Sequence, residues 1–335
     1  MRVLLICNYK LGVGGISGQV ELLQKYLREE GHVADIFSTK DSVWRRILML
    51  GKLRRVATQY DVLHIHCCSG WGFLPAVVGI TVGRRLGKRI VLTYHGGGGE
   101  SFFDRRHRLV CHFLSRTDAN IVLSGFLAQV FEKHKLPYIV IPNIIELDDA
   151  QFRERDILRP SFICTRAHEP LYNIPCILRA FQKVQKKRPE AMLTLIGSGS
   201  QHDNLVQMVK GMELRNVTFT GRIENKDIYQ YLDQSDIFVS APKVDNMPVS
   251  ILEAMNAGLL VISSRVGGVP YMVEEGETGL LFESDNDMEL AERMLWAVEN
   301  QSQAKCMILC AHKSVKRYRW ESIKENIYTT YGISA

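Results

Sequence analysis

The chain has 335 residues, of which 46% are hydrophobic and 23% charged, and its formal net charge is +6. This length suffices for two α/β domains with separate cores, and the composition is that of a globular protein. The apolar run in MRVLLICNYK at the N-terminus is too short for a signal peptide or a membrane-spanning helix, and the same holds for every other apolar run.

The first predicted elements are a strand over Arg2–Asn8 and a helix that ends near Glu30. The glycine-rich segment between them, LGVGGISGQV (Leu11–Val20), is compatible with a dinucleotide fingerprint, with Asp35 as the ribose acid. Three residues separate the strand from the first glycine, and Asp35 falls in mid-strand, so this interpretation is less favoured. It leaves an NAD(P)-dependent oxidoreductase as an alternative function.

A basic amphipathic helix is predicted over Ser42–Tyr60, and further basic clusters follow at Arg84–Arg89 and Arg105–Arg108. The first 150 residues hold 20 Lys and Arg against 13 Asp and Glu. Two interpretations remain open for the helix: contact with a membrane surface or lipid phosphate, or a core-covering helix with a solvated basic face. The charge itself predicts that the first half meets an anionic partner or membrane.

Core strands are predicted over Asp61–Cys67 and Arg89–Tyr94, and each ends in polar or small residues. His95 follows the second strand and precedes a run of four glycines. Ligands of open α/β sheets bind at such strand ends, so His95 is a candidate functional residue and His66 a weaker one. A structural strand-end histidine is the alternative. Two more strands complete the sheet, and the acidic segment Glu146–Asp156 is interpreted as an interdomain linker.

The second half repeats the α/β pattern. Strands are predicted over Phe162–Thr165, Met192–Ile196, Val217–Gly221 and Ile237–Ser240. Arg166, Gly197 and Arg222 each stand at the end of one of these strands. Asp285 and Asp287 precede a helix, where acids are ordinary caps, so we predict no metal site.

The segment Asp245–Gly258 (DNMPVSILEAMNAG) carries the strongest functional signal. Pro248 suits the first turn of a helix and Gly258 the left-handed position that ends one. The helix N-terminus then lies at the carboxyl end of a parallel sheet, where free N–H groups favour a phosphate. Carboxylates beside a phosphate would repel it, so Asp245 and Glu253 are expected to accept hydrogen bonds from neutral hydroxyls. Hydroxyls near a phosphate indicate a sugar nucleotide.

These residues resemble the donor site of glycosyltransferase family 4. The resemblance rests on Asp245–Gly258 and on SSRVGGVPYMVEEGETGLLF (Ser263–Phe282), and weaker similarity extends over nearly the whole chain. It implies the glycosyltransferase-B fold, an α/β fold with two Rossmann-like parallel-sheet domains facing across a cleft. The domains would be residues 1–149 on the acceptor side and 150–312 on the donor side, with a C-terminal helix, 313–335, crossing back to the first.

The resemblance also assigns roles. His95, Arg166 and Asp245 would be catalytic, with Arg166 on the diphosphate, Asp245 on the sugar hydroxyls and His95 at the reacting face. The donor nucleotide-sugar would contact Gly14, Gly15, Arg166, Gly197, Arg222, Asn246, Met247, Val249, Ser250 and Glu253. Two departures are visible. Asp245 replaces the usual Glu, and Tyr172–Asn173 replaces the usual Lys-Gly. A non-catalytic sugar-nucleotide-binding subunit is therefore a further alternative.

The implied activity is a retaining, metal-independent sugar transfer from a nucleotide diphosphate to a hydroxyl, as in cell-surface polysaccharide or glycolipid synthesis. The acceptor would be a saccharide or a lipid-linked saccharide. The resemblance implies no cofactor, and a UDP-sugar is favoured over a GDP-sugar as co-substrate. We expect no nucleic-acid partner. The eight cysteines show no CxxC pair, which indicates a reducing compartment. A cytoplasmic protein, in contact with the inner face of an anionic membrane, is the expected location.

Overall fold

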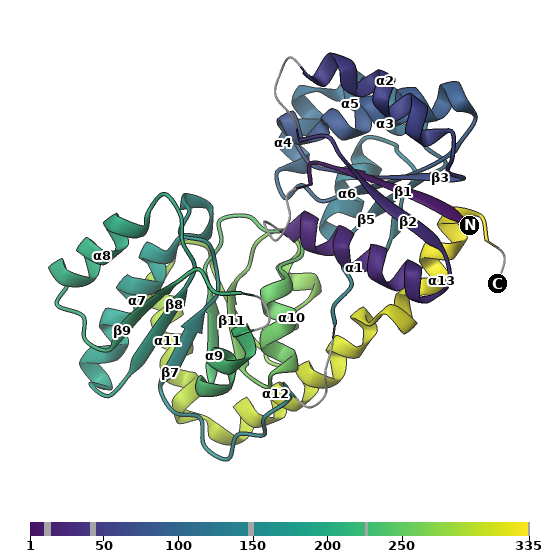
Figure 1. Ribbon diagram of the computed structural model, residues 1–335. Coiled ribbons are helices and arrows are strands. Elements are labelled where there is room, and N and C mark those ends of the chain that lie inside the picture. Colours follow the sequence, from purple (N-terminus) through teal and green to yellow (C-terminus); the bar gives the residue numbers. More distant parts are fainter. Residues whose placement is uncertain (10–14, 41–44, 147–150, 225–226, 334–335) are drawn as a thin grey trace. The chain divides into compact units, whose positions relative to one another are not determined.

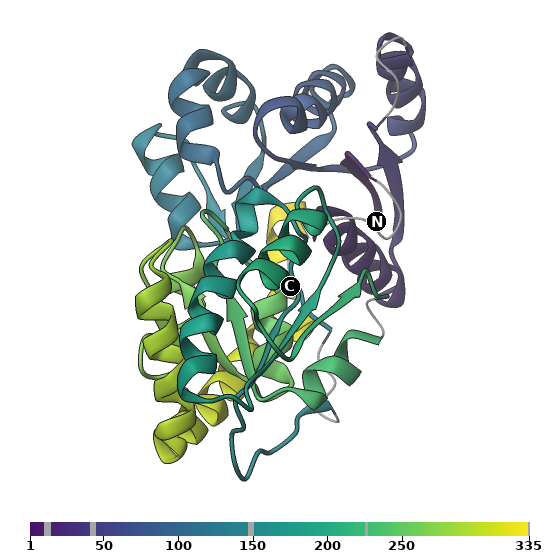
Figure 2. The same ribbon diagram turned by 90° about the vertical axis from the view of Figure 1, so that its left-hand side faces the viewer.

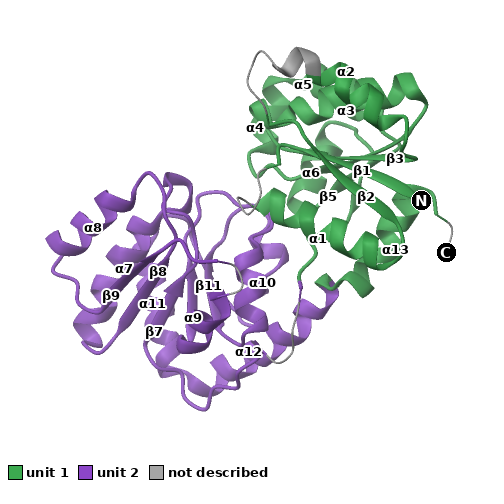
Figure 3. Ribbon diagram, in the orientation of Figure 1, with its two compact units in different colours: residues 1–145, 318–335 green, residues 146–317 purple. Residues whose placement is uncertain are grey.

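The computed structural model describes residues 1–9, 15–40, 45–146, 151–224 and 227–333, and for residues 45–48 it describes the backbone only. The chain divides into two compact units (Figure 3). Unit 1 comprises residues 1–145 and 318–335, and unit 2 comprises residues 146–317. The C-terminal segment therefore belongs to the same unit as the N-terminus.

Unit 1 contains a parallel six-stranded sheet of order β2-β1-β3-β4-β5-β6. Its strands are β1 (Arg2–Cys7), β2 (Val33–Ser38), β3 (Val62–Cys67), β4 (Arg89–Tyr94), β5 (Ala119–Val122) and β6 (Ile139–Val140). The central strands are continuous runs of buried residues, as expected for parallel strands covered on both faces.

Helices cover both faces of this sheet (Figure 1). Residues that alternate along the strands divide between two hydrophobic clusters, because successive side chains of a strand point to opposite faces. One cluster includes α1 (Gly15–Glu29) and α13 (Trp320–Tyr331). The other includes α2 (Arg45–Ala57), α3 (Leu74–Leu86), α4 (Gly99–Arg105), α5 (His107–Leu114) and α6 (Gly125–Lys133). In α2, Leu53 and Ala57 are buried whereas Lys52, Arg54 and Arg55 are exposed.

Unit 2 contains a second parallel six-stranded sheet of order β12-β11-β10-β7-β8-β9. Its strands are β7 (Ser161–Cys164), β8 (Met192–Ile196), β9 (Val217–Gly221), β10 (Ile237–Ser240), β11 (Leu260–Ser264) and β12 (Leu280–Phe282). Counted within the unit, this is the 3-2-1-4-5-6 order of dinucleotide-binding sheets. The chain reverses its winding between the adjacent strands β7 and β10, and the carboxyl ends of these two strands form the expected ligand crevice.

The helices of unit 2 are α7 (Ile174–Lys187), α8 (His202–Gly211), α9 (Ile228–Gln234), α10 (Val249–Asn256), α11 (Asp287–Glu299) and α12 (Gln301–Ser314). Figure 2, turned by 90° from Figure 1, shows the helices of each unit flanking its strands. Helices α7, α8, α11 and α12 share one hydrophobic cluster with the sheet. None of the helices that the structure describes is long and apolar enough to cross a membrane.

The predicted segment from Asp245 to Gly258 forms a loop and α10. Pro248 is the N-cap of α10 rather than its first helical residue, so the helix begins one position later than predicted. Gly258 has a φ of +75°, the left-handed conformation that the sequence predicted for the end of this helix. The helix buries Ile251, Leu252 and Met255.

The predicted interdomain linker Glu146–Asp156 is only partly a linker, and residues 147–150 lie outside the described ranges. Arg155 is 3% exposed. It donates from Nε to Asp236 Oδ1 at 3.1 Å and from Nη1 to the carbonyls of Ala257 at 2.8 Å and Gly258 at 2.6 Å. Burial lowers the pKa of Arg155 to about 10, and the side chain stays charged at neutral pH. The prediction was wrong for this part because a buried carboxylate and the carbonyls at the C-terminus of α10 bind the cation.

Candidate active site

Arg166 lies at the crevice of unit 2, two positions after β7, and its partners come from the loop that follows β10 and from the first turn of α10. Arg166 Nη1 donates to Ser250 Oγ at 3.0 Å, and Nη2 forms an ion pair with the carboxylate of Asp245. The side chains of Arg166 and Asp245 are 11% and 17% exposed. Three of the predicted site residues, far apart in the sequence, are therefore in direct contact.

Two further residues fix the position of Arg166. The guanidinium carbon lies 4.1 Å from the centre of the Tyr172 ring, a cation–π contact. Gly197 has a φ of +144°, and a Cβ at this position would lie 2.3 Å from the Arg166 carbonyl oxygen. Only glycine fits there, so the role we can assign to Gly197 is close packing of the two strand ends. Arg166 Nε is buried and has no hydrogen-bond partner among the described residues.

The loop before α10 is held in place by its own backbone. Asn246 N donates to Asp245 Oδ1 at 2.8 Å, and Gly268 N donates to the Asp245 carbonyl at 2.9 Å. Asn246 and Met247 are buried, whereas Val249 is half-buried. Since the first N–H groups of a helix have no acceptor within it, those at the start of α10 present a positive partial charge beside Arg166. This arrangement suits an anion.

Glu253 lies on α10, one turn after Ser250 and Val249, and is half-buried. Desolvation raises the pKa of its carboxyl from 4.5 to about 7, although the positive charge of Arg166 opposes the shift. No hydrogen bond from another described residue reaches this carboxyl. A desolvated carboxyl group with free acceptor oxygens is well suited to bind hydroxyl groups.

Within unit 2, Arg222 is the predicted donor-site residue that lies away from this cluster, and Gly14 and Gly15 belong to unit 1. Arg222 is exposed and follows β9, the edge strand of the sheet, two strands away from β7. Gly15 is exposed at the start of α1 in unit 1. Gly14 lies outside the described residues. For these three residues the assigned contacts stay predictions.

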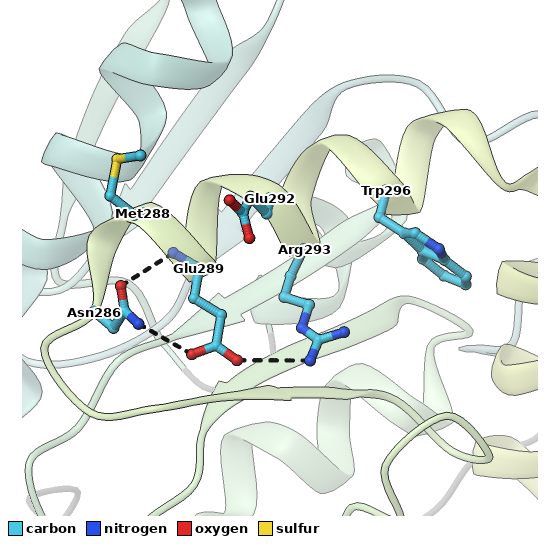
Figure 4. Close-up of a pocket in the computed structure, with 6 residues that line it drawn as sticks. All are labelled: Asn286, Met288, Glu289, Glu292, Arg293 and Trp296. Atoms are coloured by element: carbon cyan, nitrogen blue, oxygen red, sulfur yellow. Dashed lines mark hydrogen bonds and ion pairs between the residues drawn. The ribbon is translucent and has the colours of Figure 1, made fainter.

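Asp285 and Asp287, which the sequence assigned to helix capping, form ion pairs with basic side chains of α7. Arg179 lies 3.1 Å from Asp285 Oδ1 and 3.2 Å from Asp287 Oδ1, and Lys183 pairs with Asp287. The N-cap of α11 is Asn286, whose side chain accepts from Glu289 N. Neighbouring α11, a surface hollow of about 580 Å³ contains none of the predicted site residues (Figure 4). It is lined by Asn286, Met288, Glu289, Glu292, Arg293 and Trp296.

In unit 1, His95 belongs to a row of neutral polar side chains that runs from the middle of β3 to the carboxyl end of the sheet. His95 Nε2 lies 3.0 Å from His66 Nδ1. His64 contacts Tyr331 Oη of α13 at 2.7 Å and Thr93 Oγ1 at 2.8 Å. Burial lowers the pKa of His95 to about 4 and that of His64 to about 3, so both imidazoles are neutral at physiological pH. A neutral His95 can donate a hydrogen bond to an uncharged polar group or accept one from it.

Sequence reasoning missed two of these contacts. The alternation in DVLHIHC places His64 and His66 on one face of β3, which is a usable signal for the row. The missed contacts are that of Tyr331 with His64 and that of Tyr172 with Arg166. Tyr331 lies 267 residues from His64, and a turn separates Tyr172 from Arg166, so neither pair has a regular spacing that the sequence could show.

The alternative ribose acid, Asp35, is occupied by structural contacts. Its carboxylate lies 2.9 Å from Arg28 Nη2 and accepts from Tyr60 Oη at 2.8 Å. It lies inside β2 and not at its carboxyl end. This geometry argues against the dinucleotide site.

Two protein-family models match the chain. The model "Glycosyl transferases group 1" matches residues 154–313, and "Glycosyltransferase Family 4" matches residues 36–149. The chain is 24% identical over 309 residues to N-acetyl-alpha-D-glucosaminyl L-malate synthase of Bacillus anthracis, covering 85% of this chain and 78% of that protein. It is 22% identical over 372 residues to a phosphatidyl-myo-inositol mannosyltransferase of Mycobacterium tuberculosis, covering 99% and 96%.

Solved structures share the fold. The structure of HepE from Anabaena in complex with UDP-glucose has a TM-score of 0.80 at 18% identity. The match covers 99% of this chain and 99% of that chain. Sucrose-phosphate synthase from Thermosynechococcus elongatus has a TM-score of 0.82 at 18% identity, with 99% of this chain and 98% of that chain covered. The predicted α/β fold with two Rossmann-like parallel-sheet domains is thus confirmed. The chain belongs to the family 4, group 1 glycosyltransferases and has their glycosyltransferase-B fold.

Proposed function

We propose that this glycosyltransferase moves one sugar from a UDP-sugar to a hydroxyl of a saccharide or lipid-linked acceptor, with retention at the anomeric carbon and without a metal. The observation that carries the proposal is the position of Arg166. Its guanidinium is stacked on Tyr172, bonded to Ser250 and set beside the N-terminus of α10. A guanidinium can bind two phosphate oxygens at once, and Nε of Arg166 has no hydrogen-bond partner among the described residues.

In the proposed reaction the bond between the anomeric carbon and the β-phosphate oxygen breaks, and the acceptor oxygen bonds to the same face. The acceptor proton passes to the departing phosphate. Negative charge develops on the diphosphate, and Arg166 with the first N–H groups of α10 stabilises it. Glu253 binds the ribose hydroxyls, Asp245 the hydroxyls of the transferred sugar, and the neutral His95 contacts that sugar during transfer.

Asp245 has a second task in this proposal. Its carboxylate pairs with Arg166, so it holds the guanidinium in position and partly balances its single positive charge. Tyr172 occupies the place where the family usually has a lysine, and it supplies orientation instead of a second positive charge. We therefore expect Arg166 alone to carry most of the electrostatic stabilisation within unit 2.

The relatives support the classes of donor and acceptor. HepE has been solved with UDP and with UDP-glucose. An alpha-monoglucosyldiacylglycerol synthase of Streptococcus pneumoniae is 25% identical over 335 residues, covering 82% of this chain and 74% of that protein. A lipid-linked acceptor and a role in glycolipid or polysaccharide synthesis follow as parts of the proposal.

We also propose that the protein acts in the cytoplasm, with unit 1 against an anionic membrane. An open hollow of about 540 Å³ between α3 and α5 combines arginines with apolar side chains, which suits a lipid phosphate and its glycerol backbone. It is lined by Ile80, Thr81, Arg84, Arg85, Phe113 and Arg116. The double variant Arg84→Glu/Arg85→Glu should lose sedimentation with phosphatidylglycerol vesicles. Equal sedimentation of both proteins would contradict the membrane contact.

The decisive experiment is a thermal-shift and calorimetric screen against UDP-, GDP- and ADP-sugars, NAD and NADP, without added metal. A UDP-sugar at about 100 times its dissociation constant should raise the melting temperature by several degrees. Glu253→Ala should weaken nucleotide affinity, whereas His95→Ala should leave affinity unchanged and lower turnover. Glu292→Ala, an exposed change on α11 of the same unit, is the control.

Each outcome separates the candidate functions. A shift with NAD or NADP alone would establish the dinucleotide alternative and overturn the transferase. Donor binding without donor hydrolysis or transfer over a broad acceptor panel would favour the non-catalytic subunit. Equal, small effects of Glu253→Ala and His95→Ala on both binding and rate would overturn the assigned roles.

A further inference from the structure

Three metal-ligating side chains converge in unit 1, outside the residues assigned to sugar transfer. His107 and Cys111 lie one turn apart on α5, and His134 is the C-cap of α6. Their ligand atoms all lie within 4.8 Å of one another. The three residues come from two helices that are separated in sequence, and no CxxC pattern in the sequence predicts the cluster.

The distances within this cluster resemble those of a tetrahedral metal centre. With metal–nitrogen bonds of about 2.0–2.1 Å and a metal–sulfur bond of about 2.3 Å, neighbouring ligand atoms lie roughly 3.3–3.6 Å apart. Cys111 Sγ lies 3.5 Å from His107 Nδ1. The Nδ1 atoms of His107 and His134 lie 2.8 Å apart, as in a hydrogen bond, and must separate by about half an ångström to admit an ion. His107 is exposed, so its side chain is free to make that movement.

His134 is already oriented for a ligand. Its side chain is 6% exposed, and its ring packs edge-on against Phe103 at 5.5 Å between centroids. Its Nε2 is buried without a hydrogen-bond partner among the described residues, although Asp104 Oδ1 lies only 3.2 Å away. A metal at Nδ1 would place the ring proton on Nε2, facing this carboxylate. Such carboxylate–histidine–metal arrangements recur in proteins because they fix the tautomer and raise the basicity of the ligand.

Asp104 is itself held in this position. Lys133 Nζ lies 2.9 Å from Asp104 Oδ2 and 3.3 Å from Glu100 Oε1. Asp104 Oδ1 faces His134 Nε2 and does not belong to the group of ligand atoms. Asp104 acts as a positioning residue for His134.

We propose that His107, Cys111 and His134 bind a Zn²⁺ ion or a similar divalent transition metal, with water in the fourth position. Two imidazoles and one thiolate favour zinc or cobalt over magnesium or calcium, which prefer oxygen ligands. Binding releases the thiol proton of Cys111 to solvent. The ion joins α5 to the end of α6, and Asp104 extends the connection to α4, which follows the glycine run after His95. The ion would therefore connect these helices of unit 1, and none of its ligands is among the residues assigned to sugar transfer.

The test uses the whole protein, stripped of metal with a chelator and then freed from the chelator. Addition of CoCl₂ should give one equivalent of bound metal, visible bands of tetrahedral Co²⁺ and a near-ultraviolet thiolate-to-cobalt band. ZnCl₂ should displace the cobalt and raise the melting temperature by a few degrees, whereas MgCl₂ should do neither. Absence of stoichiometric cobalt binding by the wild-type protein would overturn the proposal.

Variants assign the ligands. Cys111→Ser should abolish the thiolate band, and Cys111→Ser, His134→Gln and His107→Gln should each weaken zinc binding by more than tenfold. Asp104→Asn should weaken it by about tenfold and keep the thiolate band, because it removes a supporting group only. His107 is exposed, so its variant tests the site even where a change at a more buried position impairs folding.

The matched control is Cys306→Ser/Cys310→Ser, which removes two exposed thiols one turn apart on α12 of unit 2. This variant should retain the complete cobalt spectrum. A spectrum that persists in Cys111→Ser, or disappears only in the control, would show that the metal binds elsewhere. UDP-sugar binding by the stripped protein is measured alongside, and it should be unchanged.

Discussion

The carboxyl ends of the two sheets differ in charge although the sheets are built alike. In unit 2 this edge carries the guanidinium of Arg166 with the carboxyl groups of Asp245 and Glu253. In unit 1 it carries His66 and His95, whose pKa values burial lowers, so that they are neutral at physiological pH. Two parallel six-stranded sheets therefore offer an anion-binding edge in one unit and an uncharged polar edge in the other.

The difference shows how one fold serves two chemical tasks. Strand order places ligands at the carboxyl ends, but the side chains that follow each strand decide what binds. A fixed positive charge suits a diphosphate whose charge increases during reaction. Neutral imidazoles suit hydroxyl groups, because they donate and accept hydrogen bonds without attracting the diphosphate to the wrong place.

The largest expected effect is the loss of the charge in unit 2. Arg166→Ala should lower turnover with the UDP-sugar by about 10²–10³-fold, equivalent to about 2.7–4 kcal/mol, because no second cation supports the diphosphate there. Steady-state kinetics of donor consumption would measure it. Arg222→Ala, at the exposed sheet edge, is the control and should cost less than tenfold. Similar losses in both variants would mean that Arg166 has no special role.

A second expected effect concerns Arg155 and Asp236, at the amino-terminal end of β10. Arg155→Met should lower the free energy of unfolding by about 3 kcal/mol, because Asp236 loses a buried partner and the C-terminus of α10 loses its donor. Urea denaturation would measure the change. Arg159, whose side chain is 53% exposed, also contacts Asp236, and Arg159→Met should cost about 1 kcal/mol or less. Equal costs would contradict the role assigned to Arg155.

A third effect depends on pH. Desolvation raises the pKa of Glu253 from 4.5 in the unfolded chain to about 7 in the folded protein. Its contribution to stability is therefore fully present below pH 4.5 and is lost as the pH rises through about 7. Glu253→Gln should be more stable than the wild type by about 1–3 kcal/mol at pH 8 and nearly equal to it at pH 4. Urea denaturation at both pH values would measure this.

Glu292→Gln, an exposed change on α11, serves as the control for the pH experiment and should show no such dependence. In parallel, nucleotide affinity of the wild type should increase from pH 6 to pH 8, as Glu253 becomes able to accept more hydrogen bonds. An affinity that is independent of pH would argue against the binding of ribose by this carboxyl.

The smallest expected effect tests the neutral edge of unit 1. Tyr331→Phe removes the hydroxyl that bonds His64 and should lower the free energy of unfolding by about 1–2 kcal/mol. Tyr328→Phe on the same helix is the matched control. The Tyr328 hydroxyl has no hydrogen-bond partner within the described part of the chain, so its removal should be nearly neutral. A larger loss in the control would contradict the importance of the contact between α13 and β3.

The amino-acid sequence by itself determined the two parallel α/β units, the strand ends and the loop and helix from Asp245 to Gly258. These features depend on apolar runs, turn residues and helix ends, which are read within a few residues of the chain. The mutual contact of Arg166, Asp245 and Ser250 agrees with the family resemblance, but its hydrogen bonds became visible only in the structure.

Only the tertiary structure decided the contacts that join distant segments. Arg155 binds the Gly258 carbonyl across 103 residues, and Tyr331 contacts His64 across 267 residues. His134 meets Cys111 across two helices, and Tyr172 is turned onto Arg166. Such pairs leave no periodic signal in the sequence, because side chains that interact across a fold need only suitable chemistry and no fixed spacing along the chain.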